Sequence, residues 1–204
     1  MVGQSAGRLI CFGDLCIDIV AHTPAFRPLE PDTTIEQLSI RVAGSAANCA
    51  VAAAAAGAKV EMLGLVGTDS FGAVILEKLS ATYVGTTFVR RSQAQTGVVV
   101  SQVKPNGERS FLSYRGANAQ SYGALPEKLV TAADYLYLSG YSMQDEASAQ
   151  TALALKALGQ TCLLDPSYLF ARDFQIRHKH HLTGVHILTP NLEEAQTDDR
   201  ANNG

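Results

Sequence analysis

The sequence contains no tryptophan, no long apolar run and no excess of charge of either sign. Its 204 residues include 16 lysines and arginines and 19 aspartates and glutamates, for a formal net charge of −3. Proteins that bind nucleic acids usually carry a basic patch and aromatic side chains for base stacking, but only 7% of the residues here are aromatic. A membrane-spanning helix needs about 18 apolar residues in a row. We therefore expect neither a nucleic-acid partner nor a membrane partner.

Cysteine is scarce, and its spacing suggests no pairing. No Cys-x-x-Cys motif occurs, and each cysteine lies among apolar residues. This pattern favours buried, reduced thiols over disulfides or a metal centre. The amino-terminal stretch reaches Gly13-Asp14 before a long apolar region develops, unlike a signal peptide. These features predict a cytoplasmic protein. The four cysteines are Cys11, Cys16, Cys49 and Cys162.

Apolar segments alternate with helix-forming segments along most of the chain. An alanine-rich helix is expected from Ser45, as a possible cap, to Ala56, with Gly57 in a left-handed conformation at its end. Strands that alternate with helices predict a parallel sheet with helices on both faces. The expected strands are 8–13, 59–67, 133–140, 161–166 and 185–191, and the other expected helices are 68–80 and 143–159.

Two segments, at about 33–42 and 97–114, do not follow this alternation. Asn106-Gly107 lies between two β-rich runs and predicts a hairpin. Residues 35–40 alternate in polarity as an edge strand does. We expect both segments to form a smaller sheet that projects from the main one.

Polar residues follow several predicted strands, at the edge where open parallel sheets bind ligands. Asp18 can accept hydrogen bonds from ligand hydroxyls, and a turn or capping role is the alternative. For Asp14, directly after Gly13, the turn role is favoured. His178 and His181 could share a helical face and bind a metal, but a solvated basic patch is the favoured interpretation.

Gly44 precedes the alanine-rich helix, where a ligand can approach the backbone and the helix N-terminus favours polar groups. Asn48 lies in the first turn, and its amide can donate and accept hydrogen bonds. Neither a Walker A loop nor a Gly-x-Gly-x-x-Gly fingerprint occurs, which disfavours a Rossmann-type dinucleotide-binding domain.

Taken in order, these segments resemble the ribokinase-like family of sugar and nucleoside kinases, the PfkB carbohydrate kinases. "FGDLCID" is similar to the family's opening strand with a substrate-binding aspartate, here Asp18. Residues 42–72 resemble its first signature, and residues 96–119 resemble its lid hairpin with the Gly-Ala-Asn that follows. "ILTPNLEEA" looks like its Asn-x-x-Glu motif. The resemblance covers residues 8–195 and leaves 196–204 as an irregular tail.

The resemblance implies a three-layer, Rossmann-like α/β fold with a β-sheet lid. It also implies transfer of the γ-phosphate of ATP to a hydroxyl group of a sugar. Asp18, Gly44 and Asn48 would hold the sugar hydroxyls, and Asn118 would belong to the same substrate site. A lid excludes water from phosphoryl transfer, which depends mainly on positioning and charge stabilisation.

Asn191 and Glu194 would support the ATP phosphates and Mg²⁺, Glu194 as a metal residue that acts through water. Lids of relatives often pair, so a homodimer through the lid is also an expectation. Cys16 and Ala43 differ from the residues of ribose-specific members, which disfavours ribose without indicating another sugar.

The main departure from the family is the absence of a Gly-Ala-Gly-Asp motif. In the family this motif supplies the anion hole and the general base, so no catalytic residue is assigned here. We expect an amino-terminal portion of a sugar kinase, with its carboxyl-terminal part missing and no phosphotransfer by this chain alone. The alternative is a non-catalytic sugar-binding or interaction protein that retains the front half of the fold.

Overall fold

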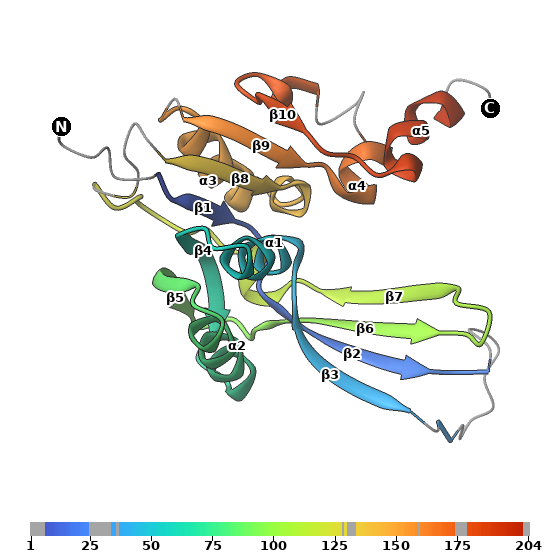
Figure 1. Cartoon of the computed structure of the whole chain (residues 1–204). Helices are drawn as coiled ribbons and strands as arrows, with labels where there is room; N and C mark the ends of the chain where they lie inside the picture. Colours follow the sequence, from blue (N-terminus) through green and yellow to red (C-terminus); the bar gives the residue numbers. More distant parts are fainter. Residues whose placement is uncertain are drawn as a thin grey trace.

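A six-stranded parallel sheet forms the centre of the molecule, and a four-stranded sheet projects from it (Figure 1). The structure is a computed structural model. It describes residues 7–24, 34–35, 37–127, 129, 134–158, 160–173 and 179–201, without the side chains of 198–201. His178 therefore lies outside the described residues.

The main sheet has the strand order β10-β9-β8-β1-β4-β5, and all neighbouring strands are parallel. Its inner strands are almost continuously apolar because both faces are covered. The predicted strands of this sheet are confirmed, whereas β5 was missed. β5 lies at the sheet edge and exposes part of its polar side chains. The strands are β1 (Leu9–Phe12), β4 (Val60–Gly67), β5 (Gly85–Ser92), β8 (Tyr135–Ser139), β9 (Thr161–Asp165) and β10 (Ile187–Leu188).

Helices cover both faces of the main sheet, which confirms the three layers. Helix α1 (Ser45–Ala55) and α2 (Ser70–Ala81) pack on one face, and α3 (Glu146–Lys156) packs on the other (Figure 1). Successive residues of β1 divide between the two apolar cores. Cys11 belongs to the core under α1, whereas Phe12 belongs to the core under α3.

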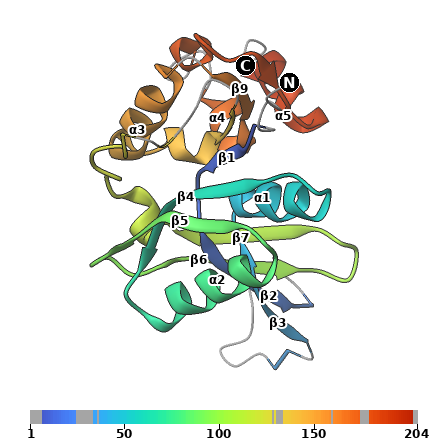
Figure 2. The same ribbon diagram turned by 60° about the vertical axis from the view of Figure 1, so that its left-hand side comes forward.

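The second sheet has the order β3-β2-β6-β7. Strands β3 and β7 pair antiparallel with their inner neighbours, and β2 pairs parallel with β6. Figure 2 shows this sheet and α2 on the side of the molecule away from α3 and α5. The predicted hairpin and edge strand are confirmed, but β2 was not expected in this sheet. The strands are β2 (Cys16–His22), β3 (Leu38–Ala43), β6 (Gly97–Val103) and β7 (Arg109–Tyr114).

The helix ends differ in part from the prediction. Gly44, not Ser45, occupies the N-cap of α1, and no side chain caps this helix. Ser45 instead hydrogen-bonds through its hydroxyl to the hydroxyl of Ser139, 2.5 Å away. Gly57 has the expected left-handed conformation after α1, with φ of 90°. Asp69 caps α2, because its carboxylate accepts the N–H of Gly72.

The last described elements are helical. Helix α4 (Ser167–Arg172) follows β9, and a 3₁₀ turn, η4 (Lys179–Leu182), precedes β10. Helix α5 (Leu192–Ala201) begins after Asn191. The predicted irregular tail is therefore wrong for residues 196–201, and 202–204 lie outside the described residues. Within the described part of the chain, no helix has the length and apolar character needed to cross a membrane.

Candidate functional site

The predicted site residues lie around the junction between the two sheets. The chain leaves β1 at residues 13–15 to enter the second sheet and returns at 44 to begin α1. It enters the second sheet again at 93–96 and leaves at 115, before the 3₁₀ turn η1 (Gly116–Ala119). The carboxyl ends of β1, β8 and β9 meet at this junction, where ligands bind in open parallel sheets.

Asp18 lies in the second sheet rather than at the end of the first strand. It is partly exposed on β2, opposite Arg41 of β3 and Val99 of β6. Its Oδ1 accepts a hydrogen bond of 2.5 Å from the hydroxyl of Ser101. Because Ser101 occupies one oxygen of the carboxylate, the other oxygen can accept a bond from a ligand hydroxyl. The contact with Ser101 could not be predicted, since the two residues are 83 positions apart.

Gly44 brings the start of α1 close to the β1–β2 connection. Its φ is 116°, and a Cβ atom at this position would lie 2.0 Å from the carbonyl oxygen of Asp14. Only glycine fits both the conformation and the space. Asn48 lies one turn into α1, donates its backbone N–H to Gly44 O and is exposed. Its side chain is thus presented to solvent at the helix end where polar ligands are favoured.

Asn118 is buried, and its amide group bonds to the backbone of Leu15. Its Oδ1 accepts the Leu15 N–H and its Nδ2 donates to the Leu15 carbonyl, both at 2.9 Å. These two bonds tie η1 to the β1–β2 connection. The predicted contact of Asn118 with substrate stays a prediction, because the contacts of its amide in this structure are with the protein backbone.

Arg115 links three elements at the junction and was not singled out from the sequence. Its guanidinium contacts both oxygens of Asp14, at 2.6 and 3.2 Å, and also pairs with Asp145 at the start of α3. Burial raises the pKa of Asp14, while Arg115 acts in the opposite direction. Asp14 therefore has a role beyond a simple turn. The available signal was only an arginine directly before Gly116-Ala117-Asn118.

A group of polar side chains lies where β8 and β9 end. The Tyr137 hydroxyl donates to Asp165 Oδ2 at 2.8 Å, and burial next to this carboxylate raises the Tyr137 pKa. Burial also raises the pKa of Tyr141, as do the carboxylates of Asp14, Glu194 and Asp165. These carboxylates come from the β1–β2 connection, α5 and β9, so the ends of several elements converge around Tyr141.

Asn191 and Glu194 form reciprocal bonds at the start of α5. The Asn191 N–H donates to Glu194 Oε2 at 3.0 Å, and the Glu194 N–H donates to Asn191 Oδ1 at 2.9 Å. This arrangement is a capping box that uses Oε2 of Glu194, so Oε1 takes no part in it and can face a ligand. Mg²⁺ often keeps most of its waters and binds one or two carboxylates. The remaining oxygen of Glu194 fits such a hydrated ion. Among the described residues no group of three or more histidine, cysteine or acidic side chains could hold a metal directly.

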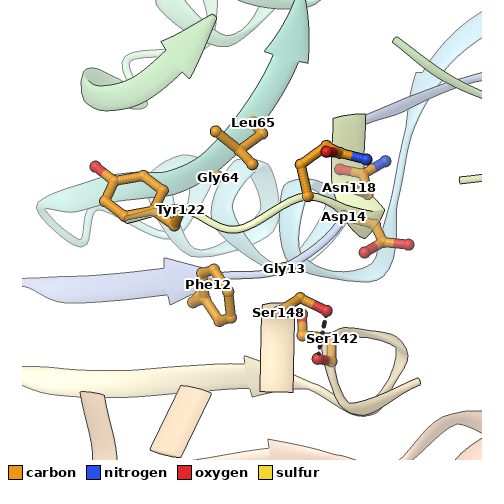
Figure 3. A pocket seen from close by; sticks show the side chains of 10 residues that line it. Phe12, Gly13, Asp14, Gly64, Leu65, Asn118, Tyr122, Ser142 and Ser148 are labelled. Atoms are coloured by element: carbon orange, nitrogen blue, oxygen red, sulfur yellow. Dashed lines mark hydrogen bonds between the residues drawn. The ribbon is translucent and has the colours of Figure 1, made fainter. Parts of the chain in front are cut away.

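Two cavities adjoin the junction. Figure 3 shows the first, of about 10 Å³, which is lined by Gly13, Asp14, Asn118 and Ser142 among others. This volume suits a single water molecule rather than a sugar. The second, of about 380 Å³, opens between the start of α2 and the second sheet, where Phe71 and Tyr114 line it. The residues lining this second cavity do not include the predicted substrate residues.

Comparison with known proteins identifies the family to which this chain belongs. The family model for pfkB family carbohydrate kinases matches residues 6–197. The chain therefore belongs to the pfkB family of carbohydrate kinases.

Individual relatives support the same family. A ribokinase of Haemophilus influenzae is 30% identical over 198 residues, which cover 92% of this chain and 61% of the relative. A probable fructokinase-7 of Arabidopsis thaliana is 26% identical and covers 80% of this chain, with 49% of its own length matched. Among solved structures, a Cryptococcus neoformans ribokinase in complex with ADP has 26% identity and a TM-score of 0.66. That match covers 91% of this chain and 57% of the ribokinase. The chain thus spans about half to three fifths of these proteins.

Proposed function

We propose that the protein phosphorylates a hydroxyl group of a sugar with ATP, and that this chain supplies the sugar side of the site. Membership of the pfkB family carries the proposal. The junction supports it, because Asp18, Gly44 and Asn48 belong to elements that start there: β2, the α1 N-cap and α1. The polar groups suit a neutral ligand with several hydroxyls, since a carboxylate and an amide offer both acceptors and donors.

The residues of this chain have separate roles in the proposal. Asp18 accepts a sugar hydroxyl with the oxygen that Ser101 does not occupy, and Asn48 bonds to further hydroxyls. Gly44 lets the sugar approach the backbone at the start of α1. Asn118 and Arg115 position the connection between β1 and β2. When bound, ATP with Mg²⁺ supplies the phosphoryl group, and Asn191 and Glu194 hold the hydrated metal and phosphate region.

The finer part of the proposal is that residues 1–204 alone bind sugar without transferring phosphate. The motivating observation is that no Gly-Ala-Gly-Asp motif occurs in these residues. A purely sugar-binding or interaction protein is the second candidate, and the same observation favours it. We further propose a cytoplasmic location, because the four cysteines are free thiols, as is usual in reducing compartments.

Calorimetric titration with a panel of pentoses and hexoses, followed by a coupled assay for ADP release, tests the proposal. We expect at least one sugar to bind. Asp18→Asn should weaken that binding about ten- to a hundredfold, because a hydrogen bond to a charged group contributes about 1.5–3 kcal/mol. The control is Glu77→Gln, on the exposed face of α2. Absence of binding by every sugar would contradict the sugar site, and sugar-dependent ADP release would contradict inactivity of the isolated chain.

We also propose that a second copy of the chain covers one face of the second sheet. On this face, Ile40, Ile19, Val100 and Leu112 form a row across all four strands. Ile40 is 58% exposed and Leu112 is 57% exposed, which is unusual for large apolar side chains. Light scattering after gel filtration tests this proposal. A dimer that Leu112→Asp converts to a monomer supports it, and a wild-type monomer at high concentration contradicts it.

A further inference from the structure

The two faces of the second sheet differ in chemistry. Ile17 of β2 belongs to the apolar core that also contains Ile75 of α2. Because successive side chains of a strand point to opposite faces, Asp18 lies on the face turned away from α2. Its direct neighbours across the sheet, Arg41 of β3 and Val99 of β6, share this face. The proposed sugar contact therefore has an arginine beside it.

Arg41 is a cation that the fold leaves available. It is exposed, and side chains directly opposite one another in an antiparallel pair have Cβ atoms about 4.5–5.5 Å apart. Yet among the described residues the Arg41 guanidinium has no ion pair and no side-chain hydrogen bond, not even with Asp18. Ser101 explains this, because it lies on β6 and bonds Asp18 Oδ1 at 2.5 Å. Since β2 lies between β3 and β6, this bond draws the carboxylate away from Arg41.

The charges on this face favour an anion. Arg109 of β7 lies on it too, because it is opposite Val103, which follows Val99 by four residues along β6. Among the described strand residues of this face, Asp18 is the single carboxylate, against two arginines. Asp18 and Asn48 account for the neutral hydroxyls of a sugar, but a neutral sugar makes no use of an exposed cation beside them. A guanidinium is suited to the paired oxygens of a carboxylate or a phosphate, to which it donates two N–H groups.

We propose that Arg41 makes the site specific for sugars that carry an anionic group, either a carboxylate or a phosphate. The inference rests on the proposed function, because it names the substrate class of the same site. Asp18 accepts a sugar hydroxyl with the oxygen that Ser101 does not occupy, and Arg41 binds the anionic group a few bonds away. Asp18 repels that group and Arg41 attracts it, so the sugar binds in one orientation, with its anionic end at β3. Arg41 is thus a specificity residue that touches the substrate.

Calorimetric titration of the whole 204-residue chain with matched ligands tests the inference. Each neutral sugar is compared with its acid and its phosphate: ribose with ribonate and ribose 5-phosphate, and glucose with gluconate and glucose 6-phosphate. Fructose is compared with fructose 6-phosphate. We expect at least one anionic sugar to bind about ten- to a hundredfold more tightly than its neutral parent, as hydrogen bonds to charged groups contribute. Whether the acid or the phosphate gains more identifies the anionic group. The gain should shrink as ionic strength rises, because the site is exposed.

Variants separate recognition of the anion from support of the sheet. Arg41→Gln should abolish the gain and change the affinity for the neutral parent by less than about twofold. Arg41→Lys should keep part of the gain, because it keeps the charge but not the paired donors. Lys78→Gln is the matched control, since it removes an exposed cation from α2, on the other side of the second sheet, and should leave all affinities unchanged. Urea unfolding checks that each variant folds.

The outcomes distinguish this inference from the sugar site itself. Neutral sugars that bind as tightly as their acids and phosphates would overturn the role of Arg41 and leave the sugar site standing. Equal losses for neutral and anionic sugars in Arg41→Gln would make Arg41 a structural cross-strand partner and would also overturn it. Inorganic phosphate that binds as tightly as the sugar phosphates would do the same, since the sugar would then contribute nothing. Absence of binding by every ligand would contradict the proposed function, and this inference with it.

Discussion

Arg115 carries the ion pairs at the junction between the two sheets, and Arg115→Met should destabilise the fold by about 3 kcal/mol near neutral pH. Methionine keeps much of the apolar length of arginine but leaves Asp14 without its cation. Breaking a buried ion pair costs about 3–5 kcal/mol, because the remaining charge is uncompensated. The side chains of Arg115 and Asp14 are 20% and 15% exposed, so partial hydration places the loss at the lower end of this range.

The loss should depend on pH through Asp14. Burial already raises the pKa of this carboxyl group in the presence of Arg115, which opposes the rise. Without the guanidinium the pKa rises further, since the neighbouring Asp145 also acts in that direction. A carboxyl group with a raised folded-state pKa penalises folding only when it is ionised. The charge of Asp14 also acts on Tyr141 and Cys16. Burial raises the pKa of both groups, so they stay neutral at acidic and neutral pH.

Urea unfolding near neutral pH and at about pH 4, close to the ordinary pKa of aspartate, measures the effect. We expect a smaller loss at the acidic pH, where a proton neutralises Asp14. Arg115→Lys should lose an intermediate amount of stability, because lysine keeps the charge but not the bidentate contact with Asp14. The double variant Arg115→Met with Asp14→Asn should recover part of the stability at neutral pH. Equal losses at both pH values, together with simple additivity in the double variant, would refute the reasoning.

Four further substitutions, one of them a surface control, test the connections and the core by thermal and urea unfolding. Gly44→Ala should cost about 2–4 kcal/mol, because its positive φ and the carbonyl oxygen 2.0 Å from the added Cβ both oppose it; an unchanged midpoint would contradict this. Asp69→Ala should cost about 2–3 kcal/mol through a lost cap and the unpaired N–H of Thr96. Burial raises the pKa of Asp69, but hydrogen bonds from Thr96 outweigh it and lower this pKa. The stabilisation by Asp69 is therefore present above the unfolded-state pKa and should be lost as pH falls through the folded-state pKa. Leu155→Ala, in the core under α3, should cost about 2–5 kcal/mol, whereas Leu153→Ala, 39% exposed on the same helix, should cost under about 1 kcal/mol.

The main sheet could largely be predicted because burial on both faces leaves a plain signal. Four of its strands are apolar runs that end at glycines, prolines or helix starts: β1, β4, β8 and β9. Strand β5 has no such signal, because its sequence GTTFVRRS mixes threonine and arginine at a partly solvated edge. Strand β2 was missed as part of the second sheet, because the change of direction at residues 13–15 depends on distant contacts, such as that of Leu15 with Asn118.

The candidate site could be predicted only where its residues belong to continuous motifs. Asp18, Asn48, Asn191 and Glu194 each stand in a short pattern that can be recognised along the chain. Arg115 lies within the lid segment 96–119, but nothing in that segment indicates its role, because its partner Asp14 is 101 positions away. A contact of this kind depends on the tertiary arrangement of both sheets, which local propensity and periodicity do not encode.

The concentration of side-chain bonds at the junction follows from how the chain crosses it. Each passage between the sheets interrupts a β ladder, and the backbone groups released there must find other partners. Asn118 bonds the N–H and C=O of Leu15, and Asp69 bonds the N–H of Thr96. These side chains therefore fix the second sheet relative to the first. Because Asp18 lies in the second sheet while Asn48 lies on α1 over the first, the same bonds also fix the separation of the two proposed sugar contacts. If the proposed function is correct, Asn118 would therefore influence sugar affinity through its bonds to the Leu15 backbone, in addition to any direct contact with the sugar.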